Sequence, residues 1–315
     1  MKFLILLIGL MFFCAPVEAK FQVEAPSPTT EFHKMSYAPV YPTYSWEPVL
    51  GAEFYQVQVV NERGKIVSEL LNDESLSRVT DWWAFTEAGK YYWRVRVVDE
   101  HNKPISAWSE KSFFEVTTPV TFAALGDSIT HGGAAFIPAG QISCQWETFC
   151  DFPVKNIGRS GDITELMIER FENDVLPFAP KVLIIMGGVN DIRAGLAADE
   201  IISNLKTLRE KCKANQIEAV FCTLTPINEK ILRGKGIYLT DKDWRAEMEK
   251  VNAWILENGG VDVSSRLSDF DGELSETLTH DGLHPDLRGK MFIGKAIQNF
   301  LSEHYFNFIF GPEVW

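Results

Sequence analysis

Alternating hydrophobic and polar positions mark the first third of the chain. Residues 55–59 and 91–97 each place Tyr, Val or Trp at every second position, with Gln, Tyr or Arg between them. A period of two with one polar face is typical of antiparallel strands. Turn-forming residues interrupt the pattern at 61–64 and 102–104. Short strands over about 100 residues predict an all-β sandwich that spans residues 20–117.

The hydrophobic pattern changes after Thr117. Residues 120–125, 182–186 and 218–224 form apolar or mostly apolar runs, which suit parallel strands buried on both faces. Helical spacing lies between these runs, and the predicted helices are 162–173, 199–214, 243–257 and 286–304. Alternation of strand and helix predicts a three-layer α/β domain with a parallel sheet over residues 118–315. In such sheets the site lies beyond the carboxyl ends of the strands.

The first nineteen residues have the pattern of a signal peptide. Lys2 precedes an apolar run, Phe3 to Cys14, and Val17-Glu18-Ala19 matches the small-x-small cleavage pattern. We predict cleavage after Ala19 and a secreted or periplasmic protein, with an uncleaved anchor as the alternative. No other stretch is apolar for long enough to span a membrane.

Composition and net charge limit the classes of partner and cofactor that the protein can bind. The 315 residues are 46% hydrophobic and carry a net charge of −13, which suits a folded chain and disfavours nucleic acid. Export implies an oxidising compartment, where disulfides form. Cys144 and Cys150 flank a short loop, and we predict a disulfide between them. Cys212 and Cys222 either pair or are buried thiols. No Cys-x-x-Cys occurs, and we expect neither a metal nor another cofactor.

A serine and a distant Asp-x-x-His segment carry candidate chemistry. Ser128, in Gly-Asp-Ser-Ile-Thr, directly follows the apolar run 120–125 and so lies at a strand's carboxyl end. A serine hydroxyl needs a base to become a strong nucleophile. His284 can supply it, and Asp281, three residues earlier, can hold the other imidazole nitrogen.

Two further segments belong to the same edge of the sheet. Gly187-Gly188-Val189-Asn190-Asp191 follows the run 182–186, and residues 156–162 follow a short predicted strand around 153–155. The second segment contains Gly161. A side-chain amide and an unhindered glycine N–H are the donors that an oxyanion hole uses.

These four segments, in this order, resemble the SGNH (GDSL-like) hydrolase superfamily. Mapped by motif, the family's serine, glycine, asparagine and histidine correspond to Ser128, Gly161, Asn190 and His284, with Asp281 as the third triad member. The resemblance covers about residues 118 to 315. It implies a flavodoxin-like fold with a five-stranded parallel sheet between helices.

The resemblance also implies acyl transfer to Ser128 and then to water. The Ser128 and Gly161 N–H groups and the Asn190 side chain would stabilise the oxyanion. Ile129 replaces the leucine of the commoner Gly-Asp-Ser-Leu version, a conservative change.

The first half resembles a fibronectin type III domain. Tyr44 to Val49 is similar to its early tryptophan strand, Tyr91 to Val95 to its central core strand, and Ser106 to Ser109 to the segment before its last strand. An immunoglobulin-like sandwich is the alternative.

Several polar residues have two interpretations. Asp127 and Asp191 are catalytic carboxylates or, as we favour, acceptors for loop backbone near the site. His280 and His284 are four residues apart, like a metal pair, but no Glu follows His280 as in metalloproteases, and we predict no metal.

Other candidates concern substrate contact. His131 could contact substrate or could be an ordinary loop histidine with no role in the reaction. Trp146 could line the mouth of the site. Trp82 and Trp83 could form a sugar-stacking platform, although we expect one of them to fill the core.

The favoured function is that of an exported ester hydrolase acting on a carbohydrate O-acetyl group. An appended sandwich is more typical of enzymes that act on polymers, so an acetylated polysaccharide is the expected substrate. The alternatives are a lysophospholipase, fatty-acyl esterase or thioesterase, an acyltransferase, and a non-catalytic binding or adhesion protein.

Overall fold

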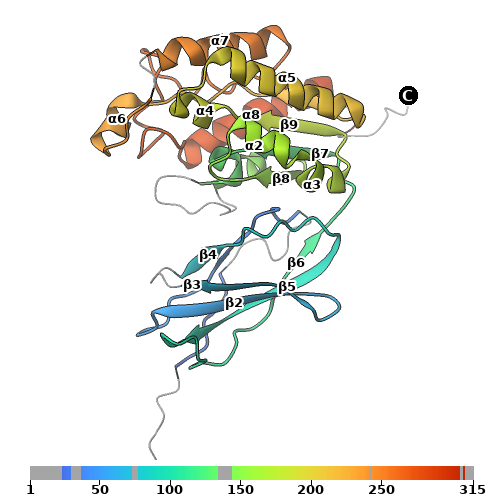
Figure 1. Ribbon diagram of the computed structural model, residues 1–315, viewed down its shortest axis with the longest axis vertical. Coiled ribbons are helices and arrows are strands. Elements are labelled where there is room, and N and C mark those ends of the chain that lie inside the picture. The colour runs from blue at the N-terminus through green and yellow to red at the C-terminus, as the bar shows by residue number, and fades with distance from the viewer. Residues whose placement is uncertain are drawn as a thin grey trace, which may run out of the picture.

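A computed structural model describes residues 23–29, 37–72, 77–133, 144–240, 243–305 and 308 of the chain. It contains an all-β domain followed by an α/β domain (Figure 1). The predicted signal peptide, residues 1–19, lies outside the described residues.

The β-domain contains the predicted antiparallel strands. One sheet has the order β3-β2-β5-β6, and β1 and β4 form a second, two-stranded sheet. The strands are β1 Thr43–Ser45, β2 Phe54–Asn61, β3 Ile66–Asn72, β4 Arg78–Thr80, β5 Gly89–Val98 and β6 Ser112–Val116. The alternating positions of β5 are buried at Tyr91, Trp93, Val95 and Val97, which confirms the period of two.

The α/β domain has a parallel sheet with the order β10-β9-β7-β8. These strands are β7 Phe122–Gly126, β8 Val154–Gly158, β9 Val182–Met186 and β10 Glu218–Phe221. The expected fifth strand is reduced, among the described residues, to a single parallel bridge between Cys222 and Val261 beside β10. The segment after Val261 leaves the sheet, because the next N–H groups, of Val263 and Ser264, donate to the Thr223 hydroxyl.

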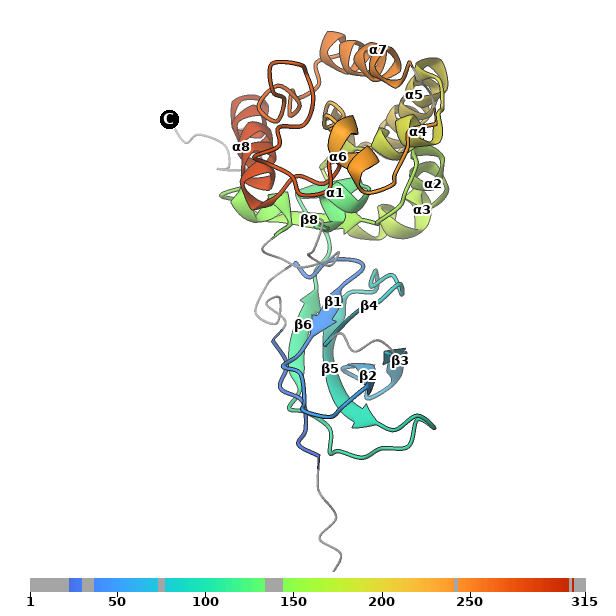
Figure 2. The ribbon, with the colours of Figure 1, turned by 90° about the vertical axis from the view of Figure 1, so that its left-hand side faces the viewer.

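Helices cover both faces of this sheet. Figure 2 shows α8 on one side, with α2, α4 and α5 on the other. The helices are α1 Ser128–His131, η3 Trp146–Phe149, α2 Thr164–Glu169, α3 Phe171–Asp174, η4 Leu176–Phe178, α4 Val189–Ala194, α5 Ala198–Ala214, α6 Glu229–Gly234, α7 Trp244–Glu257 and α8 Leu287–His304. The predicted helix 162–173 is split at Arg170, whose ψ of 0° departs from helical geometry. Within the described ranges, none of these helices has the length and apolar composition to cross a membrane.

A short segment before β1 packs against the α/β domain. Residues 37–42, here called the junction segment, precede β1 and lie against β8, the edge strand of the parallel sheet. The Val40 N–H donates to the Asn156 carbonyl at 3.0 Å, and the Lys155 ammonium donates to the Ala38 carbonyl at 2.5 Å. On the opposite side, the Phe85 N–H donates to the Val40 carbonyl at 3.0 Å. The segment therefore covers an edge that would otherwise offer unpaired backbone groups.

The predicted disulfide between Cys144 and Cys150 is wrong. The short helix η3 separates the two residues, and the Cys150 thiol is directed to the Gly294 carbonyl of α8, 3.6 Å away. Cys212 and Cys222 are buried thiols, the second of the two alternatives. The predicted domain boundary at 117/118 falls in the connection between β6 and β7 and stays a prediction.

Candidate active site

Ser128 begins helix α1 at the carboxyl end of strand β7. Asp127 caps this helix, because its carboxylate accepts the Ile129 N–H at 2.9 Å. The Ser128 side chain is partly exposed. Its N–H belongs to the first turn, where the helix itself supplies no acceptor. The strand end therefore presents both a hydroxyl and a backbone donor.

His284 and Asp281 lie beside Ser128 although they are more than 150 residues away in the chain. Ser128 Oγ lies 2.8 Å from His284 Nε2, and His284 Nδ1 lies 2.6 Å from Asp281 Oδ2. Since a carboxylate only accepts, His284 Nδ1 carries the proton and Nε2 accepts the serine hydroxyl. This is the geometry of a nucleophile with its base and orienting acid.

Asp281 is held in the ionised form. Its partial burial opposes ionisation, but hydrogen bonds from the His284 ring and from the Leu283 and His284 N–H groups outweigh it. Together they hold the pKa of Asp281 well below its usual range.

Gly161, in the loop after β8, and Asn190, at the start of helix α4 after β9, both follow the carboxyl ends of their strands. Gly161 has a φ of +89°, a backbone conformation that favours glycine. Asn190 lies in the first turn of α4, and its Nδ2 donates to the Asp162 carbonyl at 2.9 Å. Arg193 donates to its Oδ1 at 3.0 Å, which fixes the orientation of the amide. An amide nitrogen carries two hydrogens, so Nδ2 can donate to a ligand as well as to the Asp162 carbonyl.

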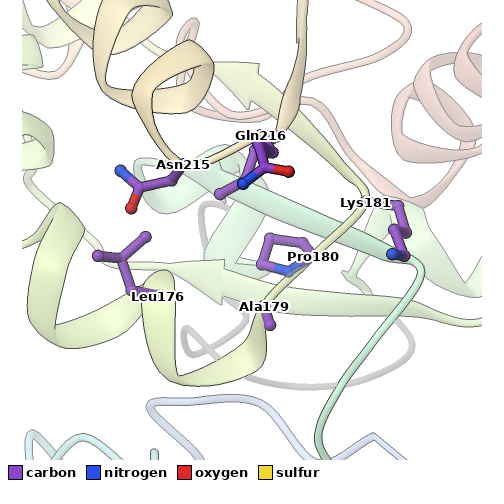
Figure 3. A pocket seen from close by; sticks show the side chains of 7 residues that line it. Leu176, Ala179, Pro180, Lys181, Asn215 and Gln216 are labelled. Carbon is purple, nitrogen blue, oxygen red and sulfur yellow. The ribbon is translucent and has the colours of Figure 1, made fainter.

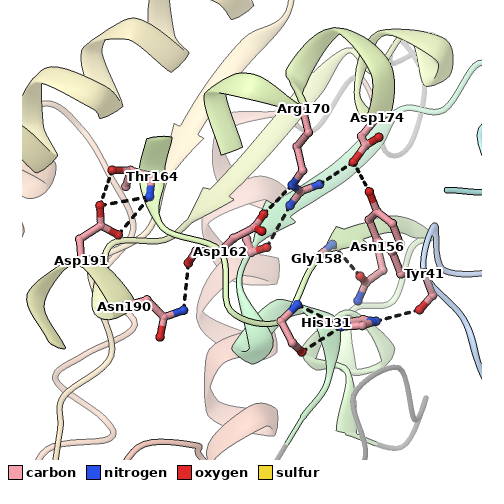
Figure 4. A network of polar contacts seen from close by, with 12 residues as sticks. Tyr41, His131, Asn156, Gly158, Asp162, Thr164, Arg170, Asp174, Asn190 and Asp191 are labelled. Atoms are coloured by element: carbon pink, nitrogen blue, oxygen red, sulfur yellow. Dashed lines mark hydrogen bonds and ion pairs between the residues drawn. The ribbon is translucent and has the colours of Figure 1, made fainter. Parts of the chain in front are cut away.

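Buried charges support these loops (Figure 4). The Asp191 carboxylate accepts the Thr164 N–H and hydroxyl, so it serves loop backbone as predicted, like Asp127. Arg170 donates to Asp162 at 2.5 Å and to Asp174 at 3.1 Å. Burial raises the pKa of Asp162, although Arg170 acts against it.

The structure decides between the two interpretations of His131 and of Trp146 and corrects the expectation for Trp82 and Trp83. His131 is fully buried, with its ring held by Ser160 and by the Tyr41 carbonyl, so it does not face substrate. Trp146 is also fully buried and donates to the Thr130 hydroxyl at 3.3 Å, instead of lining the mouth of the site. Trp82 and Trp83 are both exposed, at 53% and 58%, so neither fills the core.

Arg170, Asp174 and Tyr41 are the site residues that the sequence did not reveal. The Tyr41 hydroxyl donates to Asp174 across 133 residues of chain. No local spacing signals such a contact, because it depends on the packing of the two domains.

A pocket of about 340 Å³ lies at the opposite end of the strands from Ser128. It is lined by residues that precede β9 and β10, namely Leu176, Ala179, Pro180, Lys181, Asn215, Gln216 and Ile217 (Figure 3). It therefore lies at the amino ends of these strands, at the far end from Ser128.

Comparison with known proteins identifies the family. Residues 124–291, more than half of the chain, match the model of the GDSL-like lipase/acylhydrolase family. The chain belongs to this family. It is accordingly an ester-hydrolysing serine hydrolase, and the α/β domain is the hydrolase domain. Residues 43–118 match the Rha78A-like N-terminal immunoglobulin domain, which corresponds to the immunoglobulin-like alternative for the β-domain.

Other similarities are more distant. An N-acylneuraminate cytidylyltransferase of Streptococcus agalactiae serotype III is 27% identical over 47% of this chain, and the match spans 34% of that protein. The chain thus spans about a third of the length of this curated relative. Two solved structures each cover 59% of this chain at 21% identity. One is an acylhydrolase of Bacteroides fragilis, 87% covered with a TM-score of 0.47, and the other an acetylxylan esterase of Geobacillus stearothermophilus, 95% covered with a TM-score of 0.45.

Proposed function

We propose that the protein is an exported serine esterase that forms an acyl-enzyme on Ser128. The observation that carries the proposal is the continuous contact from Ser128 Oγ to His284 Nε2 and from His284 Nδ1 to Asp281. Family membership supplies the reaction class, cleavage of an acyl ester.

In the acylation step, the contacts between Ser128, His284 and Asp281 determine where the serine proton goes. Ser128 Oγ attacks the ester carbonyl carbon while its proton moves to His284 Nε2. The carbonyl oxygen becomes an oxyanion that accepts hydrogen bonds from the Ser128 and Gly161 N–H groups and from Asn190. When the intermediate collapses, the bond to the alcohol oxygen breaks, and the alcohol leaves with the proton from Nε2.

Deacylation repeats these steps with water. His284 removes a proton from water as the water oxygen attacks the acyl carbon, and the proton then returns to Ser128 Oγ as the carboxylic acid leaves. Asp281 accepts from Nδ1 throughout and stabilises the imidazolium in both halves of the reaction.

We infer that the acyl group is an acetyl group carried by a carbohydrate. Support comes from Trp82, which is half-exposed on the β-domain while its ring lies 5.9 Å from that of His131, the last residue of α1. Neighbouring Trp83 is exposed as well. An exposed indole offers a flat apolar face with a polar edge, which suits a sugar ring.

Hydrolysis of p-nitrophenyl esters from acetyl to palmitoyl, by the wild type and Ser128→Ala, tests the proposal. We expect activity that peaks at acetyl and falls by on the order of 10⁶-fold in Ser128→Ala, with an unchanged melting temperature. A peak at long acyl chains would contradict the acetyl inference and favour a fatty-acyl esterase. Turnover retained in Ser128→Ala would contradict the acyl-enzyme itself.

Export is tested separately. The motif at Val17-Glu18-Ala19 supports cleavage there, so the mature protein recovered outside the cytoplasm should begin at Lys20. An N-terminus at Met1 in that fraction would contradict the cleavage.

A further inference from the structure

Gly161 depends on its neighbours for its position. It has no side chain to anchor it, and its φ of +89° is set by the loop on either side. The two flanking residues, Ser160 and Asp162, are both held by polar contacts to side chains outside the loop. The orientation of the Gly161 N–H therefore follows from what holds these two residues.

The Ser160 flank is held through His131 to the junction segment. The Ser160 N–H donates to His131 Nδ1 at 3.2 Å, and Ser160 Oγ lies 3.0 Å from the same nitrogen. His131 Nε2 lies 2.7 Å from the Tyr41 carbonyl, which can only accept. Burial lowers the pKa of His131 to about 4, so the ring is neutral with its proton on Nε2. Each ring nitrogen thus has a fixed role.

The Asp162 flank is held through Arg170 and Asp174 to the same residue. Arg170 bridges the two aspartates, and the Tyr41 hydroxyl donates to Asp174 Oδ2 at 2.6 Å (Figure 4). Burial and the hydrogen bond to Asp174 raise the pKa of Tyr41 well above its usual range, so the hydroxyl stays protonated. All four side chains are buried.

We propose that Tyr41, which precedes the first strand of the β-domain, is a positioning residue for the oxyanion hole. Its carbonyl fixes one flank of Gly161 and its hydroxyl fixes the other. The Asp162 carbonyl also accepts from Asn190, so the second flank orients two of the three expected donors. The β-domain is then part of the catalytic unit, and its role rests on the proposed function.

This role predicts a loss in turnover rather than in binding. Oxyanion donors act on the charge that develops in the transition state, so a displaced donor lowers kcat and leaves KM nearly unchanged. A Tyr41 that only stabilised the fold would lower the melting temperature without this selective change.

Tyr41→Phe, measured with p-nitrophenyl acetate on the full chain, tests the proposal. The variant removes the hydroxyl and keeps the ring, which packs near Trp82 and His131. We expect kcat to fall about tenfold with KM within about twofold of wild type. Tyr44→Phe is the matched control, because the Tyr44 hydroxyl also lies near an aspartate, Asp81 at 3.4 Å, but within the β-domain. It should leave both constants unchanged.

Hydrogen exchange and a second variant complete the test. Amide exchange in a peptide covering 158–162 should be faster in Tyr41→Phe and unchanged in Tyr44→Phe. If Tyr41→Phe does not fold, Asp174→Asn decides, since it weakens the pairing with Arg170 and should lower kcat in the same selective way. Equal kcat values for wild type, Tyr41→Phe and Asp174→Asn would overturn the proposal. A wild type that hydrolyses no ester, or a Ser128→Ala variant that still does, would instead overturn the proposed function.

Discussion

The two ends of the parallel sheet in the hydrolase domain are built from the same strands but differ in chemistry. At the carboxyl ends, the segments after β7, β8 and β9 carry Ser128, Gly161 and Asn190, and buried ion pairs lie next to them. At the amino ends of β9 and β10 lies the 340 Å³ pocket, whose only charged lining residue is Lys181. The comparison teaches that the arrangement of polar groups, and not the size of a hollow, locates the chemistry.

The carboxyl end also carries costs that the amino end does not. Arg170, Asp162 and Asp174 are all buried there, and burying charges requires close pairing to offset their desolvation. Glu147 and Lys290 are buried nearby without a direct ion pair between them. A protein retains such groups where they fix a functional geometry. Substitutions at the catalytic donors of the carboxyl end should therefore lower ester turnover, whereas substitutions at the amino end should leave it unchanged.

The largest change in turnover is expected for Asn190, the side-chain oxyanion donor at the carboxyl end. Asn190→Ala should lower kcat by on the order of 100- to 1000-fold with little change in KM, since the amide acts in the transition state. Steady-state kinetics on p-nitrophenyl acetate would measure it. Asn204→Ala is the control, because the Asn204 amide donates to the Thr164 hydroxyl and is not one of the expected oxyanion donors. Comparable losses in both variants would indicate a packing effect and weaken the contrast.

A second effect concerns stability and pH. Burial raises the pKa of Glu147 from 4.5 to about 8, and the attraction of Lys290 does not cancel the shift. Between these values the folded protein binds more protons than the unfolded chain, so the stability contributed by protonated Glu147 is lost as pH rises toward 8.

Glu147→Gln should remove this dependence. At pH 5 the variant and the wild type should have similar free energies of unfolding, and at pH 8 the variant should be more stable by about 1–3 kcal/mol. Urea unfolding at intervals between pH 5 and 8 would measure both. Glu165→Gln, on the exposed surface of α2, makes the same charge change without burial and should follow the wild type. Parallel profiles for all three proteins would contradict the prediction.

The smallest effect is expected at the amino end. Gln216 lines the pocket after helix α5 with a φ of 59°, a conformation that glycine adopts more easily. Gln216→Gly should stabilise the protein by about 0.5–1 kcal/mol and leave ester turnover unchanged. Thermal melting and the p-nitrophenyl acetate assay would test this together. A loss of turnover would show that this pocket does contribute to the reaction.

The sequence predicted the elements whose signal is local. Strand β9 was predicted with its observed bounds, and helix α5 within one residue, because continuous apolar runs and helical spacing are read directly from neighbouring positions. The contact between Ser128 and His284 was predicted from ordered motifs, and the structure brings these residues together. Their roles in catalysis stay predictions until turnover is measured.

What the sequence could not predict depends on distance through space. Trp146 looks like a loop residue in the sequence, but α8 packs on η3 and buries it. The two loop cysteines are close in sequence, yet the intervening helix turns one thiol toward α8. Likewise, nothing near Tyr41 in the sequence indicates Asp174, because the two meet only when the domains pack together.

The junction segment also affects how the protein can be divided. Strand β8 has the backbone of an edge strand, and the only chain that covers it in the described structure comes from residues synthesised more than 100 positions earlier. During synthesis this cover is available before the edge exists, which suits folding from the N-terminus. A recombinant fragment that begins at residue 118 would present β8 uncovered and the Lys155 ammonium without its acceptor. Such a fragment is expected to self-associate through that strand, so the excised hydrolase domain is a poor substitute for the whole enzyme.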